Sequence, residues 1–387
     1  MSAFHSSPPS LKRPFGSLSP PVWRASTVVF DSLQAFVDRK HRQPDGFSYG
    51  VTGTPTSREL EDRIAALEGA NHCVIAPSGA AALMTCVMGF VRGGDHLLVS
   101  AACYGSLQAF CENWLARMGV EIELYAPSIG ADIVQQLRPN TRMICIEAPG
   151  SNSMEMCDVP AIAAAARSRG VLTMMDNTWA SPLGFQPLAH GVDFSVEAAT
   201  KFFGGHSDVL MGAISMNDPQ HYAVLRDAQS TLGQQVSPDD CFLVLRGLET
   251  YPLRWQAQGD STLAVAQWLQ GQPQVKRLLY PALETDPGHA LWKRDFRTNG
   301  CLFSMQLNPA SDEAFKRFFD ALEHIAIGAS WGGVHSLAAF YPAQLQASRQ
   351  FSITDQPLVR LAIGLENIDL IKQDLERGLA AFSSEAA

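Results

Sequence analysis

Lys201 lies in a segment whose residue types suit covalent chemistry on a carbonyl compound. Residues 198–205 read Ala-Ala-Thr-Lys-Phe-Phe-Gly-Gly, so small and apolar residues flank the lysine. Burial lowers the pKa of a lysine amine, and the neutral amine can then form a Schiff base. The hydroxyl of Thr200 could bind a nearby phosphate. Taken alone, the segment also fits a surface lysine whose stem covers apolar neighbours.

Asp176 directly follows the apolar run at residues 171–175. In an open α/β sheet, the carboxyl ends of the strands form the ligand crevice. A carboxylate at that place could keep the ring nitrogen of a heterocyclic cofactor protonated. The alternative for this segment alone is an aspartate that caps the following turn.

Ser78 and Gly79 open a run of small residues after a predicted strand that ends at Ala76. A helix that begins here has free backbone N–H groups and the positive end of its dipole, which together can hold a phosphate. An ordinary strand–turn–helix junction is the alternative. The segment has neither a Gly-x-Gly-x-x-Gly pattern nor a Walker lysine, which argues against a dinucleotide or a nucleoside triphosphate.

Together, the three segments are far more specific than any one of them. In chain order they supply a phosphate cradle, an acid for a ring nitrogen and a Schiff-base lysine. Pyridoxal 5'-phosphate needs these three groups from a protein. The sequence therefore predicts a site for this cofactor.

The elements that must position these residues alternate along the first part of the chain. The predicted strands are residues 72–76, 96–100, 142–147 and 171–175. The predicted helices are residues 57–69, 133–137 and 160–170. This alternation predicts an α/β fold with a mostly parallel sheet that helices cover on both faces.

The chain changes character after about residue 250. The later predicted elements are helices at residues 259–271 and 311–323 and strands at residues 302–307 and 358–363. A chain of 387 residues exceeds the usual size of a single core. We therefore expect an N-terminal segment over residues 1–56, with a flexible Pro-rich entry over residues 1–22, a cofactor-binding α/β domain over 57–250 and a smaller α+β domain over 251–387.

Composition excludes several classes of function. The formal net charge is -9 and no run of five basic residues occurs, which argues against nucleic acid as a partner. No signal-peptide h-region or membrane-spanning run is present, so we expect no membrane association and a cytoplasmic location. The eight cysteines form no Cys-x-x-Cys pair, which predicts buried reduced thiols and no metal site.

From about Tyr49 to Leu375, the chain resembles the Cys/Met-metabolism, or trans-sulfuration, family of pyridoxal-phosphate enzymes. Within that family it is most similar to the bacterial cystathionine beta-lyase group. The segments that carry the resemblance are residues 49–56, 149–151 with Met154 and Glu155, 176–179, 199–201, 205–208, 330–333 and 360–366.

The resemblance implies a fold and a role for each matching residue. The fold would be the aspartate aminotransferase-like fold of pyridoxal-phosphate transferases, fold type I. The cofactor would be held by Gly79, Ala80 and Thr200 at the phosphate, Asp176 at the ring nitrogen, Tyr104 on the ring face and Lys201 by a covalent bond. The catalytic residues would be Lys201, Tyr104 and Tyr49, and the substrate would be bound by Arg360, Ser330, Trp331 and Asn152.

The resemblance also implies an assembly and an activity. Tyr49 would enter the site of a neighbouring subunit, so residues 1–56 would contribute to that subunit within a homotetramer built from dimers. The substrate would be a small amino acid. The implied reaction is beta-elimination of cystathionine, or of a related cysteine S-conjugate, to a thiol, pyruvate and ammonia.

Three positions depart from the family pattern. Many members have arginine where Val51 stands, and that arginine reaches the phosphate of the neighbouring subunit. His335 stands where glutamate is frequent, and Ala329 stands where the beta-lyases have tyrosine. The last two changes bear on the substrate pocket.

Other functions remain as alternatives to beta-elimination. A relative that acts at Cγ, such as a gamma-lyase or gamma-synthase, would use the same scaffold with a second proton abstraction at Cβ. Trp331 and residues 149–151 favour the beta-lyase, whereas Ala329 weakens that assignment. A non-catalytic relative would lack the lysine or the aspartate, and both are present.

Overall fold

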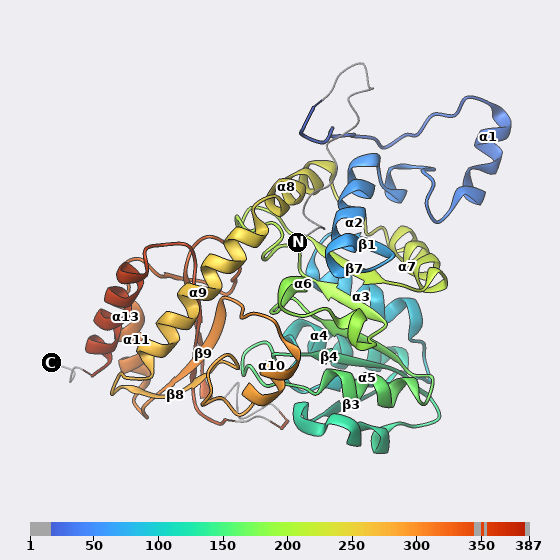
Figure 1. The fold of residues 1–387 in the computed structure, drawn as a ribbon. Helices are drawn as coiled ribbons and strands as arrows, with labels where there is room; N and C mark the ends of the chain where they lie inside the picture. The colour runs from blue at the N-terminus through green and yellow to red at the C-terminus, as the bar shows by residue number, and fades with distance from the viewer. Residues whose placement is uncertain (1–16, 344–349, 352–353, 384–387) are drawn as a thin grey trace.

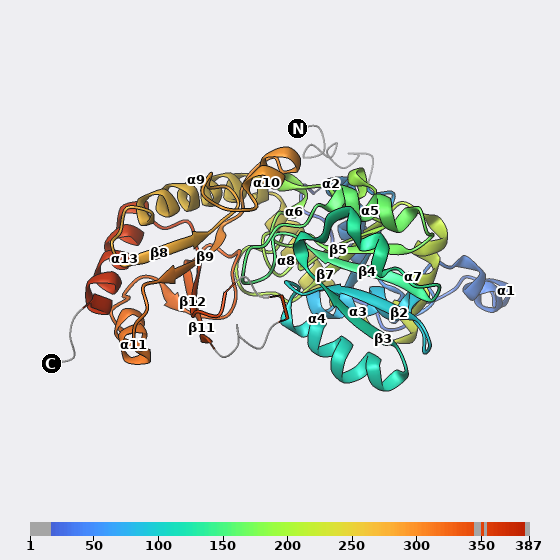
Figure 2. The same ribbon diagram turned by 90° about the horizontal axis from the view of Figure 1, so that it is seen from below.

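Two β-sheets form the framework of the molecule. The computed structural model describes residues 17–343, 350–351 and 354–383, so most of the predicted Pro-rich entry lies outside the described residues. The sheets lie side by side, and helices α8 (Pro238–Leu248) and α9 (Tyr251–Leu269) run from the first sheet toward the second (Figure 1). Figure 2 shows the two sheets from below, each with its own layer of helices.

The larger sheet has seven strands in the order β1-β7-β6-β5-β4-β2-β3. These strands are β1 (His72–Ala76), β2 (His96–Ser100), β3 (Glu121–Tyr125), β4 (Thr141–Glu147), β5 (Leu172–Asp176), β6 (Phe194–Glu197) and β7 (Gly212–Met216). All neighbours pair in parallel except β7, which runs antiparallel to both β1 and β6. The prediction of a mostly parallel sheet is therefore confirmed.

Both faces of this sheet are buried. Alternate residues of β1 illustrate this, because they pack into apolar clusters on opposite faces. Val74 and Ala76 pack into one apolar cluster with α3, and Cys73 and Ile75 pack into another with α2. Successive side chains of a strand point to opposite faces, so a strand that is apolar throughout needs cover on both. Helices α3, α4 and α7 supply one layer, and α2, α5 and α8 lie on the other side (Figure 1).

Helices occur from the beginning to the end of the described chain. The α-helices other than α8 and α9 are α1 (Leu33–Val37), α2 (Pro55–Glu68), α3 (Gly79–Phe90), α4 (Gly105–Phe110), α5 (Val159–Arg167), α6 (Ser181–Gly184), α7 (Pro219–Thr231), α10 (His289–Asp295), α11 (Asp312–Asp320) and α13 (Ile368–Ser383). The 3₁₀ segments are η2 (Asp38–Arg42), η3 (Gly50–Thr52), η5 (Ala116–Met118), η6 (Pro127–Gln136) and η7 (Pro187–His190), and η4 (Cys111–Leu115) is a short π-helix.

The smaller sheet has the strand order β10-β11-β12-β9-β8. Its strands are β8 (Val275–Leu279), β9 (Leu302–Leu307), β10 (Ala326–Ile327), β11 (Leu337–Tyr341) and β12 (Leu358–Ala362). Helices α9, α11 and α13 pack together beside it (Figure 2). This sheet brings β12, and with it Arg360, toward the large sheet. The division at residue 250 into two domains stays a prediction.

Most predicted elements are confirmed within three residues of their expected ends. Two expectations need correction. The helix predicted at residues 259–271 begins eight residues earlier, at Tyr251, because Pro252 fits its first turn and Gly259 does not break it. The lack of a side chain at Gly259 allows a close approach, since a Cβ there would lie 2.8 Å from the carbonyl oxygen of Asn299. The helix predicted at residues 133–137 is a 3₁₀ segment with a kink at Gly130.

The cysteines are all buried and free, as expected. Among the described residues, no helix is both long and apolar enough to cross a membrane. The stretch through α1 extends away from the two sheets and leaves apolar side chains such as Val29 and Leu33 exposed (Figure 1).

Candidate active site

Lys201 lies in the turn that follows β6. Its N–H donates to the carbonyl of Ala198 at 2.9 Å, and its own carbonyl accepts from the N–H of Gly205 at 2.7 Å. The Nζ atom donates to Oγ of Ser330 at 2.8 Å and lies 5.1 Å from the centre of the Trp331 ring. Burial, with the charge of Arg360 as the next cause, lowers the pKa of Lys201 to about 8. Near neutral pH, a larger fraction of this amine is therefore neutral than in an ordinary lysine.

The loop that carries Ser330 and Trp331 lies directly against Lys201. Gly332 has a φ of 82°, and a Cβ at this position would lie 3.0 Å from Cβ of Lys201. A side chain would therefore be strained by the backbone conformation and would crowd the lysine. Glycine at this position lets the loop place Ser330 within hydrogen-bond distance of Nζ.

Asp176 ends β5 at the carboxyl edge of the large sheet. Its Oδ1 accepts from the N–H of Thr178 at 3.1 Å and from the Thr178 hydroxyl at 2.5 Å. Burial raises the pKa of Asp176, and the hydrogen bonds from Thr178 and the charge of Lys201 oppose that rise. A cationic ring nitrogen beside this carboxylate would stabilise its charged form further.

The predicted phosphate cradle forms the first turn of α3. Oγ of Ser78 accepts from the N–H of Ala81 at 3.0 Å, which caps the helix. The N–H groups of Gly79 and Ala80 lie in the same turn, where a helix has no backbone acceptors for its donors. A Cβ on Gly79 would lie 2.6 Å from Cβ of Ala198, so a side chain there would push the cradle away from the Lys201 turn.

The Thr200 hydroxyl, which was predicted to bind a phosphate, already makes two hydrogen bonds within the protein. Its hydroxyl donates to the carbonyl of Met211 at 3.1 Å and accepts from the N–H of Met211 at 2.9 Å. These bonds fasten the Lys201 turn to the residue before β7. Contact with a phosphate requires the Thr200 hydroxyl to turn its proton away from the Met211 carbonyl.

Arg360 is buried on β12 and faces the large sheet. One terminal nitrogen, Nη1, donates to Oδ1 of Asn152 at 2.9 Å, and the other, Nη2, donates to the carbonyl of Ala329 at 2.9 Å. The ring of Tyr341 lies 5.1 Å from the guanidinium carbon. Burial lowers the pKa of Arg360 from its usual value, but arginine stays charged in any case. These bonds fix the position and the orientation of the guanidinium plane before any ligand binds.

Tyr104 lies at the start of α4 with its ring substantially exposed. Its N–H donates to Oε2 of Glu147 at 2.5 Å. Glu147 ends β4 and pairs with Asp176 in the sheet register, so two carboxylates lie at neighbouring strand ends. The negative charge of Glu147 also acts on Arg360, where it opposes the lowering of the arginine pKa by burial.

Tyr49 stands apart from the other candidate residues. It precedes η3, and 55% of its surface is exposed. Within the described part of the chain, no hydrogen bond or ring contact joins it to Lys201 or Arg360. His335, one of the three departures, is likewise exposed and lies 3.8 Å from a carboxylate oxygen of Glu366. Ala329 contributes only its backbone carbonyl to Arg360.

The residues present fit pyridoxal phosphate, because one residue joins the three predicted segments. The N–H of Ala198 donates to Oγ1 of Thr178 at 2.9 Å, next to Asp176. Its carbonyl accepts from Lys201, and its methyl group contacts Gly79. The cradle, the acid and the lysine are therefore fixed around one point at the edge of the sheet.

Three further residues belong to this arrangement but were not predicted. Thr178 lies in the segment that contains Asp176, and its position two residues on suits a turn bond. Glu147 could have been found by the argument used for Asp176, since it also ends an apolar strand. Tyr341 shares a strand face with Ala339, the register partner of Arg360, but only the strand pairing reveals this.

This arrangement on a mostly parallel sheet defines a pyridoxal-phosphate enzyme with the aspartate aminotransferase-like fold. Comparison with known proteins gives the family. The chain belongs to the Cys/Met metabolism PLP-dependent enzymes, whose family description matches residues 5–380. Pyridoxal phosphate is accordingly its cofactor.

Individual relatives cover nearly the full chain. A provisionally named cystathionine beta-lyase of Rhizobium johnstonii is 44% identical over 95% of this chain and 93% of its own. The cystathionine beta-lyase of Escherichia coli is 39% identical over 96% of this chain and 95% of its own. The solved cystathionine gamma synthase of Xanthomonas oryzae pv. oryzae has a TM-score of 0.89 at 29% identity and covers 98% of this chain and 97% of its own.

We predict that pyridoxal phosphate attaches covalently to Lys201, and that attachment reaches its full rate at a lower pH than it would with an ordinary lysine. The attachment rate to cofactor-free enzyme should rise with pH and level off above about 8, because the Lys201 amine is then mostly neutral. An ordinary lysine, with a pKa of 10.5, would give a rate that keeps rising well beyond that. Borohydride reduction and peptide mapping should place the pyridoxyl group on Lys201. A label on another lysine would show that the assignment is wrong.

We also predict that Asp176→Asn lowers kcat by at least about tenfold while the fold and cofactor content are kept. An amide accepts the same turn bonds from Thr178 but cannot keep a ring nitrogen protonated. Steady-state kinetics and the absorbance of bound cofactor measure the two effects separately. A kcat within about threefold of the parent would exclude this role for Asp176.

Proposed function

We propose that this enzyme is a carbon–sulfur lyase that acts at Cβ of cystathionine or a related cysteine S-conjugate. The products would be homocysteine or another thiol, pyruvate and ammonia. The observation that carries the proposal is that one loop contacts both the base and the carboxylate-binding cation: Ser330 accepts from Nζ of Lys201, and the adjacent Ala329 carbonyl accepts from Arg360. The names of the bacterial relatives support the same reaction.

Substrate binding would begin at Arg360. A planar guanidinium suits a bidentate pair with the substrate carboxylate. Asn152 and the Ala329 carbonyl hold that fork in one orientation, so little side-chain entropy is lost when the substrate binds. We assign Ser330, Trp331 and Asn152 to the same subsite, as lining residues beside the amino acid.

Proton movement would fall mainly to Lys201. When bound, pyridoxal phosphate supplies an electron sink that makes the Cα proton of the substrate acidic. The neutral amine of Lys201 takes that proton, and Ser330 holds Nζ in position. Asp176 keeps a proton on the cofactor's ring nitrogen. Breaking the Cβ–S bond releases a thiolate, which takes a proton from Lys201 or from Tyr104 or Tyr49, and addition of water then yields pyruvate and ammonia.

Besides the bond to Lys201 and the contact with Asp176, the cofactor would be held at its phosphate and on its ring face. Gly79 and Ala80 offer backbone N–H groups to the phosphate, and Thr200 offers a hydroxyl after its proton turns. Tyr104 has a partly exposed ring that can stack on the cofactor ring. Val51 adds no cation to the phosphate, so the helix dipole of α3 carries more of that charge interaction.

A Cγ-acting enzyme is the second candidate, and Ala329 is the observation that favours it. The position offers no aromatic side chain beside Arg360, which leaves more room above the substrate than a tyrosine would. Relatives that act at Cγ share the fold, as the gamma synthase of Xanthomonas oryzae does. Such a reaction would need a second proton abstraction, at Cβ, for which Lys201 is the available base.

We infer that the enzyme acts in the cytoplasm as a homotetramer built from dimers. Exposed apolar side chains on the N-terminal segment support an assembly, because neighbouring copies would cover them. These side chains include Val29, Leu33 and Val37. Tyr49 lies on the same segment and would complete the site of a neighbouring subunit.

Identification of the oxo acid tests the proposed reaction. With cystathionine as substrate, cleavage at Cβ gives pyruvate and homocysteine, whereas cleavage at Cγ gives 2-oxobutyrate and cysteine. Derivatisation and mass spectrometry distinguish the two acids. Pyruvate as the main product is expected, and 2-oxobutyrate as the main product would establish the second candidate instead.

We predict that Arg360→Lys raises KM for every amino-acid substrate by at least about tenfold, with a smaller effect on kcat. A point charge replaces a planar fork, and the bonds to Asn152 and the Ala329 carbonyl cannot both be kept. Inhibition by amino-acid esters, which lack a free carboxylate, should change little. Equal losses for both classes of ligand would mean that Arg360 supports the fold rather than the carboxylate.

A further inference from the structure

Strand β1 lies at the edge of the large sheet, and side chains rather than another strand satisfy its outer backbone groups. Oε1 of Glu61 accepts from the N–H of Ile75 at 3.2 Å, and Nε2 of Gln229 donates to the carbonyl of Ile75 at 2.6 Å. Nη2 of Arg226 donates to the carbonyl of Cys73 at 3.4 Å. An exposed strand edge presents unpaired donors and acceptors, and these three side chains cap this one.

The capping side chains are held by a buried ion cluster. Arg226 pairs with both carboxylate oxygens of Glu61, at 2.9 and 2.8 Å, and Arg58 donates to the same carboxylate at 2.7 Å. Only 3% of Glu61 and 1% of Arg226 is exposed. Burial alone would raise the pKa of Glu61, but the two arginines lower it below its usual value. Glu61 therefore stays ionised, and the cluster has one defined geometry.

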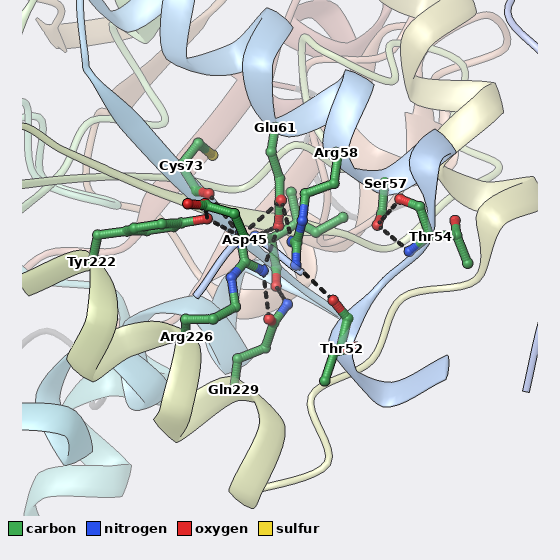
Figure 3. A network of polar contacts seen from close by, with 11 residues as sticks. Asp45, Thr52, Thr54, Ser57, Arg58, Glu61, Cys73, Tyr222, Arg226 and Gln229 are labelled. Carbon is green, nitrogen blue, oxygen red and sulfur yellow. Dashed lines mark hydrogen bonds and ion pairs between the residues drawn. The ribbon is translucent and has the colours of Figure 1, made fainter. Parts of the chain in front are cut away.

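The same cluster fastens the N-terminal segment at two points (Figure 3). Nη2 of Arg58 donates to the carbonyl of Thr52 at 2.7 Å. The Tyr222 hydroxyl, which accepts from Arg226 at 3.0 Å, donates to Oδ1 of Asp45 at 3.0 Å. Tyr49 lies between the two fastened residues. The position of its backbone is thus tied to the ion cluster.

On its other side, the cluster reaches the predicted phosphate cradle. Ile75 precedes Ser78 by three residues, and the chain passes from β1 into α3 between them. The contact of Gly79 with Ala198, where a Cβ would lie within 2.6 Å, leaves the cradle little room to shift. Because only two residues separate Ile75 from Ser78, a displacement of β1 would disturb this close contact and move the N–H groups that face the phosphate.

We propose that Arg58, Glu61, Arg226 and Gln229 are positioning residues that set the phosphate cradle and the Tyr49 segment relative to each other. Gln229 acts on the cradle through Ile75, and Arg58 acts on the segment through Thr52. In the described part of the chain, none of these four side chains is hydrogen-bonded to Gly79, Ala80, Thr200 or Lys201. The inference rests on the proposed function for the role of Tyr49, but its cradle half requires only that the enzyme binds pyridoxal phosphate.

The cradle half is tested with Gln229→Met, which removes the donor to Ile75 but keeps the side-chain volume. Full-length enzyme freed of cofactor is titrated with pyridoxal phosphate and with pyridoxal, which lacks the phosphate. The ratio of the two affinities measures the phosphate contacts alone. We expect the ratio to fall by about fivefold or more, as for the loss of one hydrogen bond. A general loss of stability would weaken both ligands equally and leave the ratio unchanged, which would overturn this half.

The segment half is tested with Arg58→Gln, which removes the charge and shortens the reach to Thr52. Hydrogen exchange of residues 45–54 in the holoenzyme should become about tenfold faster or more, since the hydrogen bond to Thr52 and the contact of the guanidinium with the Phe47 ring are lost. The loss in kcat/KM should not add to that of Tyr49→Phe in the double variant, because both changes act on one group. Arg58→Lys should restore part of the activity. Unchanged exchange, or fully additive losses, would overturn this half.

Arg63→Gln serves as the matched control. Arg63 lies on the same helix, α2, and pairs with Glu249 at 2.6 Å on the surface, so the variant also removes an arginine–glutamate pair. It should leave the affinity ratio and the exchange of residues 45–54 unchanged. If Gln229→Met does not fold, Gln229→Asn keeps a polar amide but withdraws it from Ile75. None of these readouts depends on which oxo acid is formed, so a failure here is distinct from a failure of the proposed reaction.

Discussion

The close packing of Gly79 against Ala198 is the constraint on which the rest of the site depends. A Cβ on Gly79 would lie 2.6 Å from Cβ of Ala198, so only glycine lets the start of α3 approach the turn after β6. Ala198 also binds Thr178 through its N–H and the Lys201 N–H through its carbonyl. One contact between two small residues therefore fixes the distance between a helix N-terminus, a carboxylate and an amine that come from three different strand ends.

The sequence predicts the parts of this site that depend on local pattern. Strands β1 and β5 could be placed within one residue because a short apolar run between turn residues is typical of a buried strand. Gly79, Asp176 and Lys201 follow such strands directly, so their location at the carboxyl edge of the sheet was foreseeable. The resemblance to a known family then supplied Arg360, Ser330 and Trp331, which no local pattern singles out.

Contacts between distant segments could not be predicted in the same way. Arg226 and Glu61 are 165 positions apart, and nothing near either residue indicates the other. The engagement of Thr200 by Met211 depends on how β7 reverses direction within the sheet. Helix α9 begins earlier than its pattern suggested. Gly259 lies inside the helix, but in the sequence a glycine is also typical of a helix end. In each case tertiary packing selects between local options that the sequence leaves equal.

The placement of Arg360 on the small sheet has a mechanical consequence. Its guanidinium reaches across to Asn152, whereas Lys201 belongs to the large sheet, and α9 is the continuous helix that leads from one side to the other (Figure 1). A ligand held by both residues bridges the two sheets. One continuous apolar cluster runs through both sheets, so packing fixes the distance from the guanidinium to the amine before a ligand arrives. The site therefore selects ligands by length, because an amino acid whose carboxylate and α-carbon do not match that distance loses one of the two contacts.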